Sequence, residues 1–329
     1  MTNPPPNADF TIAWICPSRL EFVAARETFD LAYGKHPQIL HHSDTNAYEL
    51  GKIGRNNVII ICLPPFPAAE RPWLSRYEVY KQMKTTFPSV KVGIFVAVGS
   101  GIPSALHDIR LGDVVVATPE REFWGVVELE HVSPSASASA SASGPASTTL
   151  DLKCTNLLSP KHGYSHFLTT AVHALTADRA LGVPSKIPSF LSKMFEWYPE
   201  KRAVYAYPGV ADEVLLWTDY NRGSHHNPNM QSVISRPARA DCTRPVVHSG
   251  TIAAADKSVT DVFVRGRWRE DLGIKGIPVL VVCGVGDYAG SHGDGGWRGY
   301  AAATAAAYAK ELLRTLAALP TGETGCGMF

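Results

Sequence analysis

The feature that most constrains the fold is a series of continuous apolar runs, rich in β-branched residues, that alternate with helix-forming segments. The apolar runs lie at 10–16, 58–63, 92–98, 113–117 and 277–283, and the helix-forming segments lie at 20–26, 77–87, 167–177 and 301–316. A strand that is apolar on both faces is buried on both faces, as in a parallel sheet covered by helices. The pattern therefore predicts an α/β protein with a buried, largely parallel or mixed sheet.

The length of the chain suits one large domain of this kind. Its 329 residues, of which 45% are hydrophobic, are enough to build a sizeable core. The segment 133–149 interrupts the pattern with a Ser-Ala repeat that has no large side chain to bury. We predict a disordered loop inserted into a single domain spanning 1–329, with an interdomain linker as the alternative. Segment 184–245 is poorly periodic, and 318–329 is expected to be a loose tail.

Composition narrows the class of partner. A formal net charge of +1 gives no electrostatic reason to expect nucleic acid or a membrane surface as a partner. The first residues, MTNPPPN, do not resemble a signal peptide, and the apolar runs are too short to span a membrane. The six cysteines are scattered and include no CxxC pair, which argues against a zinc site or a redox motif. We expect a cytoplasmic protein that binds a small molecule and needs no metal or organic cofactor.

Three candidate functional positions follow predicted strands. In open α/β sheets, ligands bind beyond the carboxyl ends of the strands. Glu21 begins the helix after the first strand, Gly99, Ser100 and Gly101 follow the third strand as a predicted turn, and Asp287 follows the last strand. Each position also has an alternative explanation that involves no function. Glu21, taken alone, is more typical of an exposed helix residue, most Gly-rich turns only reverse the chain, and an aspartate often caps a loop.

Longer stretches resemble those of a known family. The most specific are 108–116 (DIRLGDVVV) and 299–313 (GYAAATAAAYAKELL). Further matches lie at 13–16, 20–21, 50–54, 57–64, 82–83, 87–89, 98–104, 125–127, 208–209, 248–253, 286–289 and 291–292 and at Trp297. Together they cover nearly the whole chain in the right order. On these residues the chain resembles the purine and uridine phosphorylase superfamily, especially its divergent fungal branch.

The resemblance implies a three-layer fold, with a central mixed, largely parallel sheet flanked by helices, and cleavage of the N-glycosidic bond of a nucleoside by phosphate or water. Asp287 matches the acid that protonates the departing base, a role that this chemistry requires. Glu21 matches the residue that orients or activates water, and Gly99, Ser100 and Gly101 match the loop that holds phosphate or ribose.

The resemblance also assigns further positions and an assembly state. Thr251, Ala254, Tyr288 and Trp297 are expected to bind substrate, although tryptophans such as Trp297 more often pack in cores. Phosphate is the candidate co-substrate, and the protein is expected to form a homo-oligomer.

The chain departs from the family in one important segment. Members carry a Met-Glu pair shortly before the last strand, and its glutamate grips the ribose hydroxyls, whereas 261–275 (DVFVRGRWREDLGIK) contains no such pair. Losing a charge-assisted hydrogen bond of this kind costs roughly 1.5–3 kcal/mol. Three hypotheses therefore stay open: a divergent nucleosidase or phosphorylase, a catalytically inactive binding protein, or a pocket that acts on another, possibly apolar, metabolite.

Overall fold

The structure is a computed structural model that describes residues 3–34, 40–63, 72–104, 107–131, 152–158, 164–209, 235–255, 277–288 and 296–317. The predicted loop at 133–149, the predicted tail at 318–329 and the departing segment 261–275 lie outside these ranges. Within them, no helix is both long enough and apolar enough to cross a membrane.

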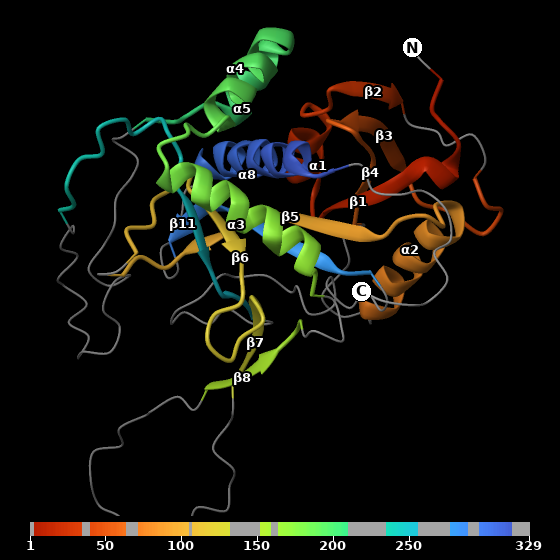
Figure 1. Cartoon of the computed structure of the whole chain (residues 1–329), viewed down its shortest axis with the longest axis horizontal. Helices are drawn as coiled ribbons and strands as arrows, with labels where there is room; N and C mark the ends of the chain where they lie inside the picture. Colours follow the sequence, from red (N-terminus) through yellow and green to blue (C-terminus); the bar gives the residue numbers. More distant parts are fainter. Residues whose placement is uncertain are drawn as a thin grey trace, which may run out of the picture.

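In the described part of the chain, a mixed sheet of eight strands forms the middle layer (Figure 1), in the order β2-β3-β4-β1-β5-β11-β6-β9. The central strands β4, β1, β5 and β11 are parallel, β6 is antiparallel to β11, and β3 is antiparallel to β4. A smaller sheet has the order β10-β7-β8. The strands are β1 (Phe10–Cys16), β2 (Leu31–Gly34), β3 (Tyr48–Ile53), β4 (Asn56–Cys62), β5 (Val92–Gly101), β6 (Val114–Ala117), β7 (Val126–His131), β8 (Leu152–Asn156), β9 (Val247–Gly250), β10 (Ile252–Ala255) and β11 (Val279–Tyr288).

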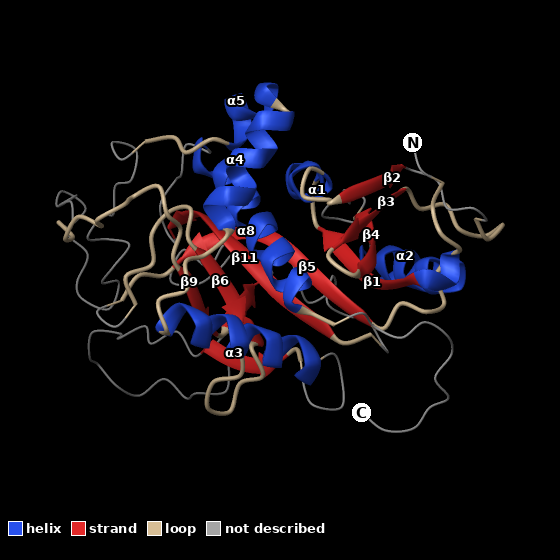
Figure 2. Ribbon diagram, turned by 45° about the horizontal axis from the view of Figure 1, so that its top comes forward, coloured by secondary structure: helices blue, strands red, loops and turns tan. Residues whose placement is uncertain are grey.

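Helices cover both faces of the large sheet, as Figure 2 shows. They are α1 (Arg19–Arg26), α2 (Pro72–Thr86), α3 (His166–Ala180), α4 (Ile187–Trp197), α5 (Arg202–Tyr205) and α8 (Gly296–Thr315), with short 3₁₀ turns at Asn7–Asp9 and Pro199–Lys201. Along β1, Ile12 and Trp14 pack in the core cluster that contains α8, whereas Ala13 and Ile15 pack in the cluster that contains Met83 of α2. The strand therefore buries both faces, and the predicted three-layer α/β fold is confirmed.

Helix α4 lies in the poorly periodic segment 184–245, for which the sequence predicts no helix. Its apolar residues Ile187, Leu191, Met194 and Phe195 are nevertheless spaced as on one face of a helix, and all four are buried. A proline in its first turn is compatible with a helix start. The periodicity of this short stretch is masked by the Pro, Arg and His residues of the surrounding segment.

The predicted turn at Gly99–Gly101 is wrong. These residues continue β5, and Gly99, Ser100 and Gly101 pair with Val285, Asp287 and Tyr288 of β11. The two strands are equally long, so β11 supplies backbone partners up to the last residue of β5. A Cβ on Gly101 would lie 2.7 Å from the Val285 side chain, so this glycine permits close packing rather than a change of direction.

The long helix α8 is buried on nearly every side. Its residues from Gly299 to Leu313 are all buried between the sheet and the helices α1, α3, α4 and α5. Small side chains make this possible, because a Cβ on Gly284 of β11 would lie 2.0 Å from the carbonyl oxygen of Ala301. The backbones of β11 and α8 therefore approach as closely as a glycine allows.

The first prediction concerns this approach. The substitution Gly284→Ala should lower the free energy of unfolding by about 3 kcal/mol or more, because the methyl group meets backbone and cannot be accommodated by a side-chain rotation. Urea denaturation followed by circular dichroism measures the change. Gly250→Ala is the matched control, since its Cβ would meet only the Glu120 side chain at 3.8 Å; it should shift stability by less than about 0.5 kcal/mol. Equal effects of the two substitutions would contradict the explanation.

Candidate functional site

The candidate site lies at the carboxyl edge of the four parallel central strands. The strands β4, β1, β5 and β11 are neighbours, so the residues that end or follow them meet at one edge of the sheet. Glu21 follows β1, and Ser100 near the end of β5 is the register partner of Asp287 near the end of β11. The fold therefore places these three positions at one edge of the sheet.

Glu21 is held by the local structure at the start of α1. Ser18 caps the helix by accepting a hydrogen bond from the backbone N–H of Leu20 (3.2 Å), and its hydroxyl donates to Glu21 Oε2. Glu21 Oε1 accepts from the backbone N–H of Val98 at 3.3 Å. The side chain is buried, with the residue 3% exposed, so the alternative of an ordinary exposed helix residue is wrong.

The bond from Val98 to Glu21 exists because β1 is shorter than β5. Pairing between the two strands ends at Phe95, which leaves the next N–H groups on that side of β5 without a strand partner. Glu21 accepts a hydrogen bond from the N–H of Val98. Alternate residues of a strand point the same way, so the N–H of Ser100 also faces the side beyond the end of β1. The carboxylate and this backbone therefore border the same space.

Three thiols lie near Glu21: those of Cys16 and Cys283 are buried, and that of Cys62 is half-buried. Burial raises the pKa of Cys16, Cys62 and Cys283, and the charge of Glu21 raises each of them further. The charge of Asp287 also raises the pKa of Cys283, which shows that both carboxylates act on the same side chain. Thiols with raised pKa values stay protonated at neutral pH, so none of the three is suited to act as a nucleophile.

Asp287 is aimed by an irregularity in β11. The register with β5 shifts between Val285 and Asp287, so Gly286 occupies a bulge, a feature that often redirects a functional side chain. Oδ2 of Asp287 lies 3.7 Å from Nη1 of Arg298 at the start of α8. Oδ1 is buried and has no hydrogen-bond partner among the described residues. A ligand that donates a hydrogen bond to Oδ1 would satisfy it.

Arginines that the sequence reasoning did not select surround the end of β11. Arg236 donates to the hydroxyl of Tyr288 at 2.7 Å and to the carbonyl of Ile109 at 3.1 Å. Arg298 and Arg236 thus contact the two residues that end β11, Asp287 and Tyr288. Arg298 lies between Trp297 and Gly299, which both belong to stretches that resemble the family. This position is the sequence feature that points to Arg298 as a site residue.

Three other residues predicted to bind substrate are Trp297, Thr251 and Ala254, and each has surroundings that differ from those of Asp287. Trp297 is 2% exposed and packs edge-on against Tyr207 and Tyr300, with ring centroids 5.2 and 6.0 Å apart. Thr251 and Ala254 lie after β9 and in β10, and Gly250 pairs with Ala117 at the end of β6. Because β6 runs antiparallel to β11, this register places Thr251 toward the amino-terminal end of β11. The structure therefore does not bring Thr251 and Ala254 to the edge that holds Asp287.

A buried aspartate, Asp113, supports the end of β11 through a network of hydrogen bonds. Asp113 is 1% exposed and accepts two hydrogen bonds from Arg239 (2.7 and 2.8 Å), one from the backbone N–H of Val246 (2.8 Å) and one from His248 (2.9 Å). Burial by itself would raise the pKa of Asp113, but the bonds from Arg239 and His248 and the charge of Arg239 lower it overall. The carbonyl of Asp113 accepts from the N–H of Val285, which ties this network to the end of β11.

The second prediction follows from the lowered pKa of Asp113. The contribution of this carboxylate to stability is complete above its ordinary pKa of 3.8 and is lost as the pH falls through the lower folded value. At pH 7, Asp113→Asn should reduce the free energy of unfolding by about 3 kcal/mol, because the largely buried Arg239 loses its counter-charge at 2.7 Å and the more distant Asp108, at 3.9 Å, replaces it poorly. Urea denaturation between pH 3 and 7 measures both effects.

Asp178→Asn is the matched control for this experiment, because Asp178 is an exposed aspartate on α3. It should change stability by less than about 0.5 kcal/mol. The bracing role would be refuted if Asp113→Asn were no more destabilising than this control at pH 7.

Comparison with known proteins adds to this geometry. No family model matches the chain. A nucleotide-binding leucine-rich repeat (NLR)-like protein of Hyaloscypha variabilis is 28% identical over 326 residues, which cover 93% of this chain and 29% of that protein. The chain therefore spans less than a third of the curated relative that it matches.

Solved structures of similar fold are described as a nucleosidase, a phosphorylase and a hydrolase. A putative 5'-methylthioadenosine/S-adenosylhomocysteine nucleosidase of Borrelia burgdorferi, bound to adenine, matches with a TM-score of 0.52 at 11% identity over 93% of this chain and all of its own. A uridine phosphorylase of Phytophthora capsici matches with 0.51 at 11% over 96% and 94%. The futalosine hydrolase of Helicobacter pylori matches with 0.50 at 13% over 94% and 99%. The chain has the fold of the nucleoside phosphorylases and nucleosidases.

Proposed function

We propose that this chain cleaves the N-glycosidic bond of a purine nucleoside or nucleotide. The observation that carries the proposal is the position of Asp287 at the sheet edge, with one buried carboxylate oxygen that has no partner in the described part of the chain. A carboxyl group in this position suits proton transfer to a nitrogen of a leaving base. The fold supports the proposal, because proteins that share it are described as nucleosidases and phosphorylases.

In the proposed reaction, an oxygen of water or phosphate forms a bond to C1′ of the sugar while the bond from C1′ to the base nitrogen breaks. The bonding electrons move into the purine, and its N7 takes the proton of Asp287. When water attacks, Glu21 accepts the proton that the water releases. A carboxylate has about four acceptor positions, and the contacts with Ser18 and Val98 use two of them. The products are the free base and the sugar or sugar phosphate.

The edge of β5 is proposed to hold the sugar or the phosphate. With the predicted turn replaced by strand, the group available for this role is the N–H of Ser100, which faces the same space as Glu21. The reaction needs no metal or organic cofactor, and phosphate enters only as a co-substrate. Tyr288, held by Arg236, is proposed to support the side of the candidate site next to Asp287.

A second candidate function is ligand binding without turnover. Two observations favour it: both oxygens of Glu21 already accept hydrogen bonds from the protein, and the curated relative is described as an NLR-like protein more than three times the length of the matched part. In this case the domain binds a nucleoside-like molecule and serves a larger protein as its recognition module.

The third prediction separates these functions. Purified protein is incubated with purine and pyrimidine nucleosides and nucleotides, with and without phosphate, and released base is measured by liquid chromatography. We expect release of a purine base, reduced about 10²–10⁴-fold by Asp287→Asn, because the isosteric amide cannot donate the proton. Dependence on phosphate identifies phosphorolysis.

Two further variants complete the experiment. Glu21→Gln should reduce release in the absence of phosphate, and Asp178→Asn on α3 serves as the matched control that retains full activity. A folded wild-type protein that releases no base from any compound, but is stabilised against heat by a nucleoside, supports the binding function instead. Full activity of Asp287→Asn would refute the role of Asp287.

A further inference from the structure

Two cysteines end neighbouring parallel strands at the edge of the sheet that holds the candidate site. Cys16 is the last residue of β1, Cys62 is the last residue of β4, and the two are register partners. Neighbouring strands lie about 4.8 Å apart. The Cα atoms of disulfide-bonded cysteines lie about 4.4–6.8 Å apart. The spacing of the two strands therefore suits a disulfide between these residues, whose thiols are free in this structure.

The two side chains point to the same face of the sheet. Two residues earlier, Trp14 and Ile60 are register partners, and both belong to the core cluster that contains α8. Because alternate residues of a strand point the same way, Cys16 and Cys62 face this side as well. Cys16 is itself a member of this cluster. The two thiols are therefore neighbours on one face.

No second strand restrains either cysteine in the described part of the chain. Pairing of β1 with β5 ends at Ile15, and pairing of β4 with β3 ends at Ile61. The N–H of Leu63 donates to the carbonyl of Cys16 at 2.8 Å and keeps the two strand ends aligned. The Cβ atoms of a disulfide lie about 3.8 Å apart, which requires an approach of about 1 Å from the strand spacing. Strand ends that pair only with each other permit this approach.

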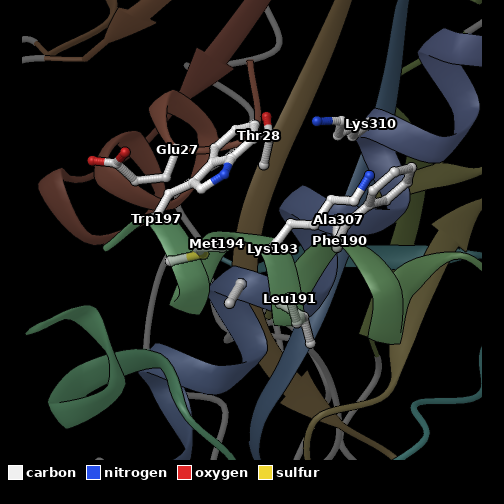
Figure 3. Close-up of a pocket in the computed structure, with 10 residues that line it drawn as sticks. Glu27, Thr28, Phe190, Leu191, Lys193, Met194, Trp197, Ala307 and Lys310 are labelled. Atoms are coloured by element: carbon white, nitrogen blue, oxygen red, sulfur yellow. The ribbon is translucent and has the colours of Figure 1, made fainter. Parts of the chain in front are cut away.

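Helix α1 lies over these strand ends and is itself firmly packed. It contacts β1, β4 and α8. Figure 3 shows the residues that follow it, Glu27 and Thr28, beside Trp197 of α4. The hollow between these residues, α4 and α8 has room for little more than a water molecule. The helix that carries Glu21 is therefore held in place above the two cysteines.

The two thiols differ in exposure, and this difference sets the order of a reaction. Cys62 is half-buried, so a small oxidant meets it first, whereas the buried Cys16 needs to reach only its neighbour. Burial and the charge of Glu21 raise the pKa of both thiols; Cys62 raises that of Cys16 further, and a hydrogen bond with Trp14 lowers it. Oxidation is therefore slow at neutral pH. A thiol with a high pKa is also a poor leaving group, so the disulfide is reduced slowly.

We propose that Cys16 and Cys62 are a modification site, at which a low-molecular-weight disulfide such as glutathione disulfide links β1 to β4. The Cys62 thiolate bonds to one sulfur of glutathione disulfide, whose S–S bond breaks and releases one glutathione. The Cys16 thiolate then bonds to Sγ of Cys62 and releases the second glutathione. The two cysteines lose two electrons and two protons, and glutathione disulfide is reduced to two molecules of glutathione. This inference does not depend on the proposed cleavage of nucleosides.

The test uses the whole protein, which is incubated with glutathione disulfide, denatured, alkylated and digested with trypsin. Cys16 falls in peptide 1–19 and Cys62 in peptide 56–76, and neither peptide contains another cysteine. We expect mass spectrometry to detect these two peptides joined by a disulfide. They should form about tenfold faster at pH 8 than at pH 7, because the thiolate fraction rises tenfold per pH unit below the pKa.

Two variants and one internal reference make the result specific. Cys62→Ala should abolish the joined peptides. Cys283→Ala should leave them unchanged, because β5 separates Cys283 from β1 and its side chain packs in the opposite core cluster. The exposed Cys154 should acquire glutathione, which shows that the oxidant is active.

The wild-type protein decides the outcome even if a variant fails to fold. The proposal is overturned if peptides 1–19 and 56–76 stay unjoined while Cys154 carries glutathione. It is also overturned if either peptide joins a different cysteine, or if Cys283→Ala removes the link.

Discussion

The contact between β11 and α8 is the constraint on which the rest of the molecule depends. Gly284 lets the helix approach until a Cβ would touch the carbonyl of Ala301, and alanines continue this close packing along the helix. A helix buried to this extent must satisfy its own polar groups and the few charges it carries. Glu311 does so by accepting hydrogen bonds from Arg179, Ser185 and the backbone of Lys186, and thereby joins α3 and α4 to the core. The central helix organises the layer around it.

The same contact places the candidate active site. Because α8 begins beside the end of β11, Arg298 comes within 3.7 Å of Asp287. A Cβ on Gly286, in the bulge before Asp287, would meet Val98 at 2.5 Å and the Arg298 side chain at 3.3 Å, so bulge, helix and β5 pack tightly together. Glu21 approaches from α1 and bonds to the backbone of Val98. The carboxylates of Glu21 and Asp287, far apart in the sequence, thus lie at the same edge of the sheet. Backbone packing fixes their positions more than their own side-chain contacts do.

The sequence predicted the strands β1, β4, β5, β6 and β11 because their signal is local. The run at Phe10–Cys16 agrees with the observed strand to the residue, since a strand buried on both faces must be apolar throughout. The turn predicted at Gly99–Gly101 failed for a non-local reason. Glycines usually end a strand, but here β11 offers a partner to every one of them, and Val285 requires the space that a side chain would fill. Helix α4 was hidden by its neighbours although its own periodicity is clear.

By itself, the sequence determined the α/β class, a buried sheet that is largely parallel or mixed, and the positions of Glu21 and Asp287 near strand ends, because the hydrophobic pattern is written in contiguous residues. Only the tertiary structure decided that Glu21 is buried and bonded to β5, and that Arg298 and Arg236 surround the end of β11. It also decided that Thr251 lies away from Asp287. These features depend on register, strand length and the distance between helices, which residues far apart in the chain set together.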